Sequence, residues 1–268
     1  MRLTEPAPAK LNLALHVRGK LPDGRHALET VFAFCTDGDR VEAEAAEALS
    51  LEFAGPFAAA LSDKDDNLVL IAARSLAEAA SVEAKASLFL TKRLPVASGI
   101  GGGSADAAAT LRLLTRLWDI DPSFAAEVAP AIGSDVPACL LSLSARGTEA
   151  GDRLELVDGG DITGAPVLLV NPGVPLATRE VFAAWDGVDH GPLGEWREGR
   201  NDLEAPARAL VPAIGDVLHW LKAREGVNFA RMSGSGATSF ALFDSEEARD
   251  RAAASCPADW WHLATFLR

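Results

Sequence analysis

Cysteine is scarce in this 268-residue sequence, and tyrosine is absent. The three cysteines, Cys35, Cys139 and Cys256, are far apart, their number is odd, and none belongs to a C-x-x-C pair. The sequence therefore indicates neither a disulfide framework nor a zinc site. Such cysteine use is typical of a reducing compartment, so we expect a cytoplasmic protein.

Long apolar stretches, repeats and an excess of basic residues are also missing. The N-terminal residues lack the apolar core of a signal peptide, and no uninterrupted apolar stretch reaches membrane-spanning length. Lys and Arg number 25 against 38 Asp and Glu, which gives a formal net charge of −13. A chain of this charge repels polyanions, so we expect no nucleic-acid partner and no membrane partner. Hydrophobic residues make up 49%, enough for the core of a globular protein with one large domain or two smaller ones.

The most informative stretch is Pro95–Asp106, where four glycines and two serines precede an Ala- and Leu-rich helical pattern. A glycine-rich turn that enters a helix leaves several backbone N–H groups without helical partners, and the helix dipole adds partial positive charge. These features favour an anion site, most often for phosphate, whereas the simpler alternative is a tight turn before a surface helix. The stretch is neither a Walker A loop nor a complete Rossmann fingerprint.

Apolar and polar residues alternate from Leu11 to Val17, which predicts a β-strand with Lys10 and Asn12 on one face. If that face is solvent-exposed, both are ordinary polar residues. If it lines a cleft, Lys10 supplies a fixed cation and Asn12 a group that both donates and accepts hydrogen bonds.

The remaining patterns predict a mixture of helices and strands, with a polar hairpin or linker at 151–164 and a long loop at 185–199. Further strands are expected at 31–34, 40–45, 49–53, 85–90, 166–171 and 262–267, with a strand–turn–strand hairpin at 229–243. Helices are expected at 68–80, 105–117, 122–131, 178–184, 201–210, 214–223 and 245–254.

Several polar residues adjoin these elements. Asp65, Asp66 and Asn67 precede a helical run as an N-cap would. Asp106 is expected in the first helical turn, where an acid complements the dipole, although a metal contact is the alternative. Asp135 lies on a turn, where an acid is usually a cap or a solvated side chain.

Three separated motifs together resemble the signatures of the GHMP kinases, a family that includes galactokinase, homoserine kinase, mevalonate kinase and phosphomevalonate kinase. They are Pro-Ala-Lys-Leu-Asn-Leu at 8–13, the Gly-Ile-Gly-Gly-Gly-Ser core of 95–109, and Met-Ser-Gly-Ser-Gly-Ala within 231–237. The segments 23–30, 66–68 and 133–137 are most similar to those members that phosphorylate cytidine-diphosphate methylerythritol. The similarity extends nearly end to end.

This resemblance implies a two-domain α+β fold with the active site in the interdomain cleft. A ribosomal-protein-S5-like N-terminal domain is expected at 1–148 and a ferredoxin-like C-terminal domain at 149–268. ATP and Mg²⁺ are the implied co-substrate and ion. The implied reaction transfers the γ-phosphoryl group to the 2-hydroxyl of cytidine-diphosphate methylerythritol, a step of the non-mevalonate route to isoprenoids. We expect a monomer or a weak homodimer.

The resemblance also assigns roles to residues. Asp135 is the base that accepts the hydroxyl proton, and Lys10 is the cation that keeps Asp135 ionised and offsets transition-state charge. The residues assigned to ATP are Asn67, Leu68, Lys92, Pro95, Ser98, Gly99, Gly101, Gly102, Gly103 and Ser104. Those assigned to the substrate are Asn12, Arg25, His26, Phe32, Asp135, Thr178 and Phe182, with His26 on the cytosine edge. No metal ligand is assigned.

One position departs from the family, because many members carry an aromatic residue where this chain has Arg25. A guanidinium can stack on a base or point to solvent. Other hypotheses stay open: a kinase for mevalonate, homoserine or another small alcohol, and a nucleotide-binding protein without transfer activity. Part of the implied fold recurs in RNA-binding ribosomal proteins, but the net charge disfavours that function.

Overall fold

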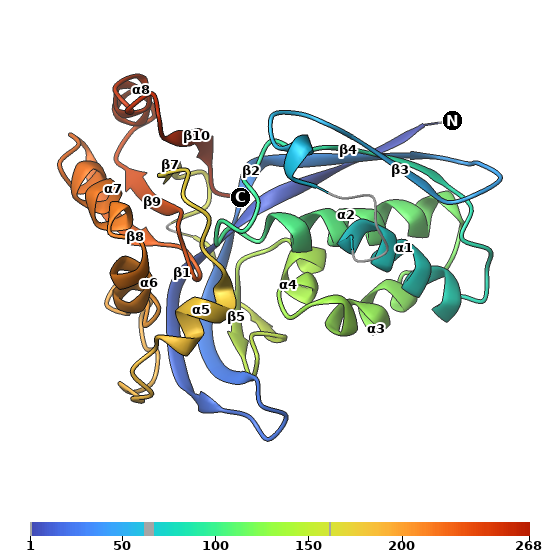
Figure 1. Cartoon of the computed structure of the whole chain (residues 1–268), viewed down its shortest axis with the longest axis horizontal. Coiled ribbons are helices and arrows are strands. Elements are labelled where there is room, and N and C mark those ends of the chain that lie inside the picture. Colours follow the sequence, from blue (N-terminus) through green and yellow to red (C-terminus); the bar gives the residue numbers. More distant parts are fainter. Residues whose placement is uncertain (1, 62–66, 161) are drawn as a thin grey trace. The chain divides into compact units, whose positions relative to one another are not determined.

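The computed structural model describes residues 2–61, 67–160 and 162–268, and they divide into two compact units (Figure 1). The first unit comprises Met1–Ala9, Asp37–Val96 and Gly101–Ser142, and the second comprises Lys10–Thr36, Ala97–Ile100 and Leu143–Arg268. Two long paired strands, β1 (Leu3–Lys20) and β2 (His26–Glu44), contribute residues to both units.

The first unit packs helices against strands. Strand β3 (Ser50–Ala54) runs parallel to β4 (Ser87–Thr91), and β4 pairs antiparallel with Arg40–Glu44 of β2. Figure 1 shows the helices of this unit gathered on one side of β3 and β4. They are α1 (Leu68–Ala79), α2 (Gly102–Leu117), α3 (Ser123–Ile132) and α4 (Val136–Leu141), besides a short 3-10 helix at Ala58–Ala60.

The second unit contains a separate antiparallel sheet in the order β10-β7-β9-β8. Its strands are β7 (Pro166–Asn171), β8 (Val227–Met232), β9 (Ser239–Phe243) and β10 (Trp261–Phe266). Apolar residues of α7 (Ala213–Lys222) and α8 (Glu246–Ala254) form one core with this sheet. The other elements are α5 (Thr178–Ala183), α6 (Glu204–Leu210) and two short strands, β5 (Ala145–Thr148), which pairs with Thr30–Phe32 of β2, and β6 (Arg153–Leu156), which pairs with β5.

Most predicted elements are present, but β1 differs from the prediction in its burial. Every residue from Ala7 to Val17 is buried, on both faces of the strand. The solvent-exposed alternative for Lys10 and Asn12 is therefore wrong. The predicted helix at 201–210 begins only at Glu204, and α4 at Val136–Leu141 was not predicted.

The remaining predictions of local structure have mixed outcomes. The polar segment 151–164 contributes β6, which forms a hairpin with β5. The expected N-cap is confirmed at Asn67, whereas Asp65 and Asp66 lie outside the described residues. Within the described ranges, no helix has the length and apolarity needed to span a membrane.

Candidate active site

Lys10 starts a hydrogen-bonded chain inside the second unit. Its Nζ donates to Asn12 Oδ1 at 2.7 Å, and Asn12 Nδ2 donates to Thr30 Oγ1 at 2.8 Å. Thr30 Oγ1 in turn donates to the carbonyl of Ala14 at 2.6 Å. Lys10 and Asn12 are each only 3% exposed, and Lys10 Nζ lies 5.5 Å from the ring centroid of Phe32. This series of hydrogen bonds therefore holds the Lys10 ammonium as a fixed cation.

The glycine-rich stretch and the third motif meet through their backbones in the second unit. Ser233 Oγ donates to the carbonyl of Gly99 at 3.0 Å and accepts from the backbone N–H of Asn12 at 3.1 Å. A Cβ on Gly99, whose φ is +76°, would lie 2.5 Å from the Ser233 carbonyl oxygen and 2.7 Å from the Gly236 nitrogen. This close approach requires glycine at position 99, whether or not a phosphate is bound.

Helix α2 of the first unit begins at Gly102, three residues before the predicted start at 105, so the glycines form its first turn. Gly101 is the N-cap in the left-handed conformation, with φ +64°, and Gly102 is the first helical residue. A Cβ on Gly103 would contact only Leu68 Cδ1 within 4 Å, at 3.3 Å. The first N–H groups of a helix have no intrahelical acceptor, and the dipole is positive there. Ser104, partly exposed in the same turn, adds a hydroxyl.

Lys92 is enclosed between two carboxylates in the first unit. Its Nζ lies 2.6 Å from Asp39 Oδ2 and 2.5 Å from Asp106 Oδ2, and none of the three side chains is more than 4% exposed. Burial raises the pKa of Asp106 to about 7, against the opposing charge of Lys92. Burial acts to lower the pKa of Lys92, but the two carboxylates raise it overall. Lys92 and Asp106 therefore keep their protons to a higher pH than the free side chains would.

The structure corrects the sequence-based view of Asp106. No acid lies in the first turn of α2, since Asp106 is the fifth helical residue. Its Oδ2 is paired with Lys92, which explains the acid without either a dipole or a metal.

Four other residues assigned to ATP lie near the starts of α1 and α2 in the chain. Asn67 Oδ1 accepts from the backbone N–H of Val69 at 3.0 Å, so this side chain caps α1, and Leu68 is the first residue of that helix. Ser98 is buried, and its carbonyl accepts from the backbone N–H of Thr238 at 3.1 Å. Pro95 is partly buried in the segment after β4.

Three aromatic rings gather in the second unit. His26 and Phe182 stack, with ring centroids 4.4 Å apart and planes at 24°, and Trp185 meets His26 edge-on at 5.8 Å. Burial lowers the pKa of His26, and the charge of Lys20 lowers it further. A neutral imidazole donates from one nitrogen and accepts at the other, as recognition of a base edge requires. Trp185 was not singled out from the sequence.

Arg25 is held by acids. Its Nε lies 2.7 Å from Asp23 Oδ2, and its Nη1 lies 2.8 Å from Asp152 Oδ2. Of the other residues assigned to the substrate, Phe32 is only 1% exposed, and Thr178 Oγ1 lies 2.9 Å from the hydroxyl of Ser235. The guanidinium of Arg25 thus already has two carboxylate partners in the chain.

Asp135 precedes α4 in the first unit. It is the N-cap residue of that helix, but its side chain makes no capping hydrogen bond. The side chain is partly exposed. The carboxylate therefore does not cap the helix.

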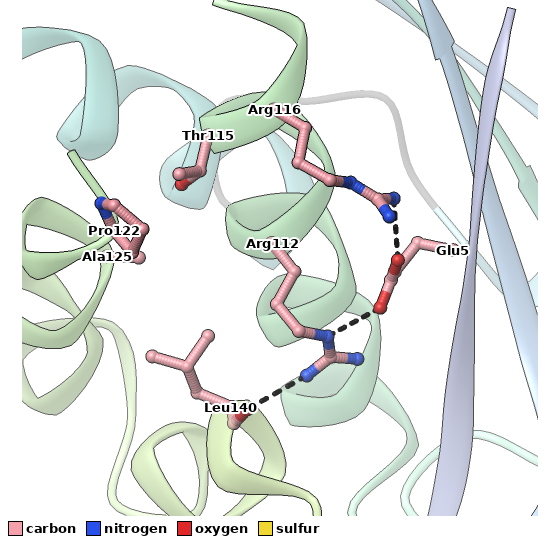
Figure 2. Close-up of a pocket in the computed structure, with 7 residues that line it drawn as sticks. All are labelled: Glu5, Arg112, Thr115, Arg116, Pro122, Ala125 and Leu140. Atoms are coloured by element: carbon pink, nitrogen blue, oxygen red, sulfur yellow. Dashed lines mark hydrogen bonds and ion pairs between the residues drawn. The ribbon is translucent and has the colours of Figure 1, made fainter. Parts of the chain in front are cut away.

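A cavity of about 380 Å³ lies elsewhere in the first unit and contains no residue assigned to catalysis or binding. Figure 2 shows Arg112 and Arg116 both directed at Glu5, at 2.7 Å each. Arg112 also donates to the carbonyls of Cys139 and Leu140. Both arginines thus have partners within the chain.

Sequence reasoning missed Thr30, Ser233 and Asp39. A signal existed for the first two, because both lie within segments that carried the family resemblance. No local pattern marks Asp39, whose importance depends on Lys92, 53 residues further along the chain.

Comparison with known proteins identifies the family. The model of the GHMP kinases N-terminal domain matches residues 67–142, and that of the GHMP kinases C-terminal domain matches residues 187–261. This chain belongs to the GHMP kinase family, whose α+β fold it shares and whose members use ATP.

Two full-length relatives in that family have the same name. The 4-diphosphocytidyl-2-C-methyl-D-erythritol kinase of Rhizorhabdus wittichii is 53% identical over 281 residues, covering 100% of this chain and 96% of that protein. The protein of the same name from Novosphingobium aromaticivorans is 50% identical over 274 residues, covering 100% and 94%. A crystal structure of 4-(cytidine 5'-diphospho)-2C-methyl-D-erythritol kinase matches with a TM-score of 0.84 at 32% identity, covering 100% of this chain and 99% of that one. The resemblance inferred from the three motifs is confirmed.

Proposed function

We propose that this chain transfers the γ-phosphoryl group of ATP to the 2-hydroxyl of 4-diphosphocytidyl-2-C-methyl-D-erythritol. The products are the 2-phosphate and ADP, and the step belongs to the non-mevalonate route to isoprenoid precursors. Full-length relatives at 50–53% identity, named for this activity, support the substrate. The observation that carries the chemistry is the buried chain from Lys10 through Asn12 to Thr30, which fixes a cation inside the protein.

The phosphates of ATP are assigned to the start of α2. Backbone N–H groups of Gly102, Gly103 and Ser104 lie in the first turn of a 16-residue helix, where unpaired donors and the dipole favour anions. Gly99 and Gly101 shape the approach to this turn through their positive φ angles. Asn67 and Leu68 at the start of α1, with Pro95 and Ser98, are proposed for the rest of the nucleotide. Lys92, whose side chain is only 2% exposed, is proposed to act on the nucleotide indirectly.

The residues fit a Mg²⁺ ion that arrives with ATP. Mg²⁺ in such sites is bound by substrate phosphates, waters and one or two protein oxygens. The described residues include no group of three or more His, Cys, Asp or Glu side chains that could hold a metal ion. The hydroxyl of Ser104 is the protein oxygen we assign to the ion. When bound, the ion would neutralise charge on the phosphoryl group that is transferred.

Phosphoryl transfer needs alignment and charge neutralisation more than covalent chemistry. Asp135 is the proposed base for the proton of the 2-hydroxyl. The Lys10 ammonium would make that hydroxyl easier to deprotonate and would offset charge in the transition state. Because Asn12 and Thr30 fix Lys10, the cation needs no reorganisation during the reaction.

The cytidine end of the substrate is assigned to the aromatic group of the second unit. A neutral His26 can hydrogen-bond to the cytosine edge, and Phe182 offers a ring face. Because His26 and Phe182 stack on each other, a cytosine that stacks on Phe182 would replace the contact between Phe182 and the His26 ring. Because Asp23 and Asp152 pair with its guanidinium, Arg25 is proposed to form part of a charged rim of the cytidine site.

The experiment that tests this function separates binding from chemistry at Asp135. Asp135→Asn is expected to bind an ATP analogue with nearly unchanged affinity while kcat falls by roughly two orders of magnitude or more. The matched control is Asp216→Asn, which makes the same change at an exposed carboxylate in the first turn of α7. If Asp135→Asn retains most of its activity, Asp135 is not the base. If the wild-type protein binds the analogue but turns over no alcohol, it is a nucleotide-binding protein instead.

A further inference from the structure

The charges around Lys92 do not balance. One ammonium faces two carboxylates in a region that water does not reach. Asp39 Oδ1 also accepts from the backbone N–H groups of Arg93 and Leu94, at 2.5 and 2.9 Å. Asp106 Oδ1, by contrast, is buried with no hydrogen-bond partner in the described part of the chain. Asp106 is therefore the less satisfied of the two carboxyl groups.

This triad lies directly against the start of α2. A Cβ on Gly102 would lie 3.0 Å from Lys92 Nζ and 3.7 Å from Asp39 Oδ2. Asp106 belongs to the next turn of the same helix. Lys92 thus links Asp106 of α2 to Asp39 of β2. With only 2% of its side chain exposed, Lys92 has no surface with which to bind a nucleotide directly.

We propose that Asp39, Lys92 and Asp106 form a positioning device that fixes the first turn of α2, and that Lys92 acts on ATP through this turn. The inference rests on the proposed function, in which that turn holds the phosphates. Asp39 anchors the ammonium to β2, and Asp106 anchors the helix to the ammonium. Neither acid touches the reacting atoms, so both are positioning residues.

Two substitutions at Asp106 test the device. Asp106→Ala removes the anchor but leaves Lys92 paired with Asp39, and we expect the KM for ATP to rise about tenfold while kcat at saturating ATP changes little. Asp106→Asn keeps an oxygen acceptor for Lys92 and is permanently neutral, so it should restore a KM close to that of the wild type. Asp121→Asn, at an exposed carboxylate of the same unit, is the control.

A second measurement does not depend on activity. Amide hydrogen exchange at 102–104 is expected to be faster in Asp106→Ala than in the wild type, and to return to the wild-type rate in Asp106→Asn. An unchanged KM for ATP in Asp106→Ala, or exchange at 102–104 equal to that of the wild type, would overturn the device. Failure of the wild-type protein to phosphorylate any alcohol would refute the proposed function instead, and the exchange rates would still decide whether the triad fixes the turn.

Discussion

Replacing Gly99 with alanine tests whether the two glycine-rich motifs must touch. At a φ of +76°, alanine is strained by about 1–2 kcal/mol. Its Cβ would lie 2.5 Å from the Ser233 carbonyl oxygen and 2.7 Å from both the nitrogen and the oxygen of Gly236, all of them backbone atoms. Overpacking of this kind costs about 1–3 kcal/mol more. We therefore expect Gly99→Ala to lower the free energy of unfolding by about 2–5 kcal/mol.

Gly103→Ala is the matched control, because it makes the same chemical change four residues away. Its Cβ would meet only the methyl end of Leu68, at 3.3 Å, in a helical turn. Stability should stay within about 1 kcal/mol of the wild type, since alanine favours helix. Urea unfolding followed by circular dichroism gives both values, provided that the m-value is unchanged. If Gly99→Ala is as stable as Gly103→Ala, the close backbone contact is not required by the fold.

Three further predictions follow from the buried polar groups. The folded protein keeps a proton on Asp106 up to a pKa of about 7, whereas the unfolded chain loses it near pH 3.8. The free energy of unfolding should therefore fall by roughly 4 kcal/mol as the pH rises from 3.8 to about 7. Urea unfolding of Asp106→Asn should show no such fall. His16 accepts a hydrogen bond from the backbone N–H of Arg200 through Nε2, while its Nδ1 lies 3.1 Å from the Gly191 carbonyl oxygen. Because burial lowers the pKa of His16, the contribution of its neutral form to the free energy of unfolding should be lost on acidification below about pH 6.5. A lower protection factor for the Arg200 amide in acid, measured against the intrinsic exchange rate at each pH, would report this loss, whereas a protection factor independent of pH would contradict it. Lys10→Met should lower kcat roughly a hundredfold or more with little change in ATP-analogue affinity, and a kcat near that of the wild type would remove Lys10 from the mechanism.

Local signals in the sequence were sufficient for much of the fold. The N-cap at Asn67, the glycine-rich entry to α2 and the hairpin of β8 and β9 each depend on residues within one short segment. Capping, turn formation and periodicity are local physical effects, so a single sequence carries them. The family resemblance added the link between the three motifs.

What the sequence did not reveal depends on distant partners. The burial of Lys10 and Asn12 requires cover on both faces of β1, including Ser233, which lies 221 residues away from Asn12 in the chain. The role of Asp106 was misjudged because its partner Lys92 lies outside the helix, 14 residues earlier in the segment after β4. Alternation along a strand specifies which residues share a face, but whether that face meets solvent is decided by tertiary packing.

The most direct test of the central claim is a competition among acceptors. The purified protein is supplied with ATP and Mg²⁺ and, in separate reactions, with 4-diphosphocytidyl-2-C-methyl-D-erythritol, mevalonate or homoserine. Phosphorylated product is measured by ³¹P NMR, which also distinguishes the hydroxyl that is modified. The account predicts a new phosphate on the 2-hydroxyl of the cytidylylated substrate and little or none on the other two alcohols. Transfer to mevalonate or homoserine without transfer to the cytidylylated substrate would contradict it.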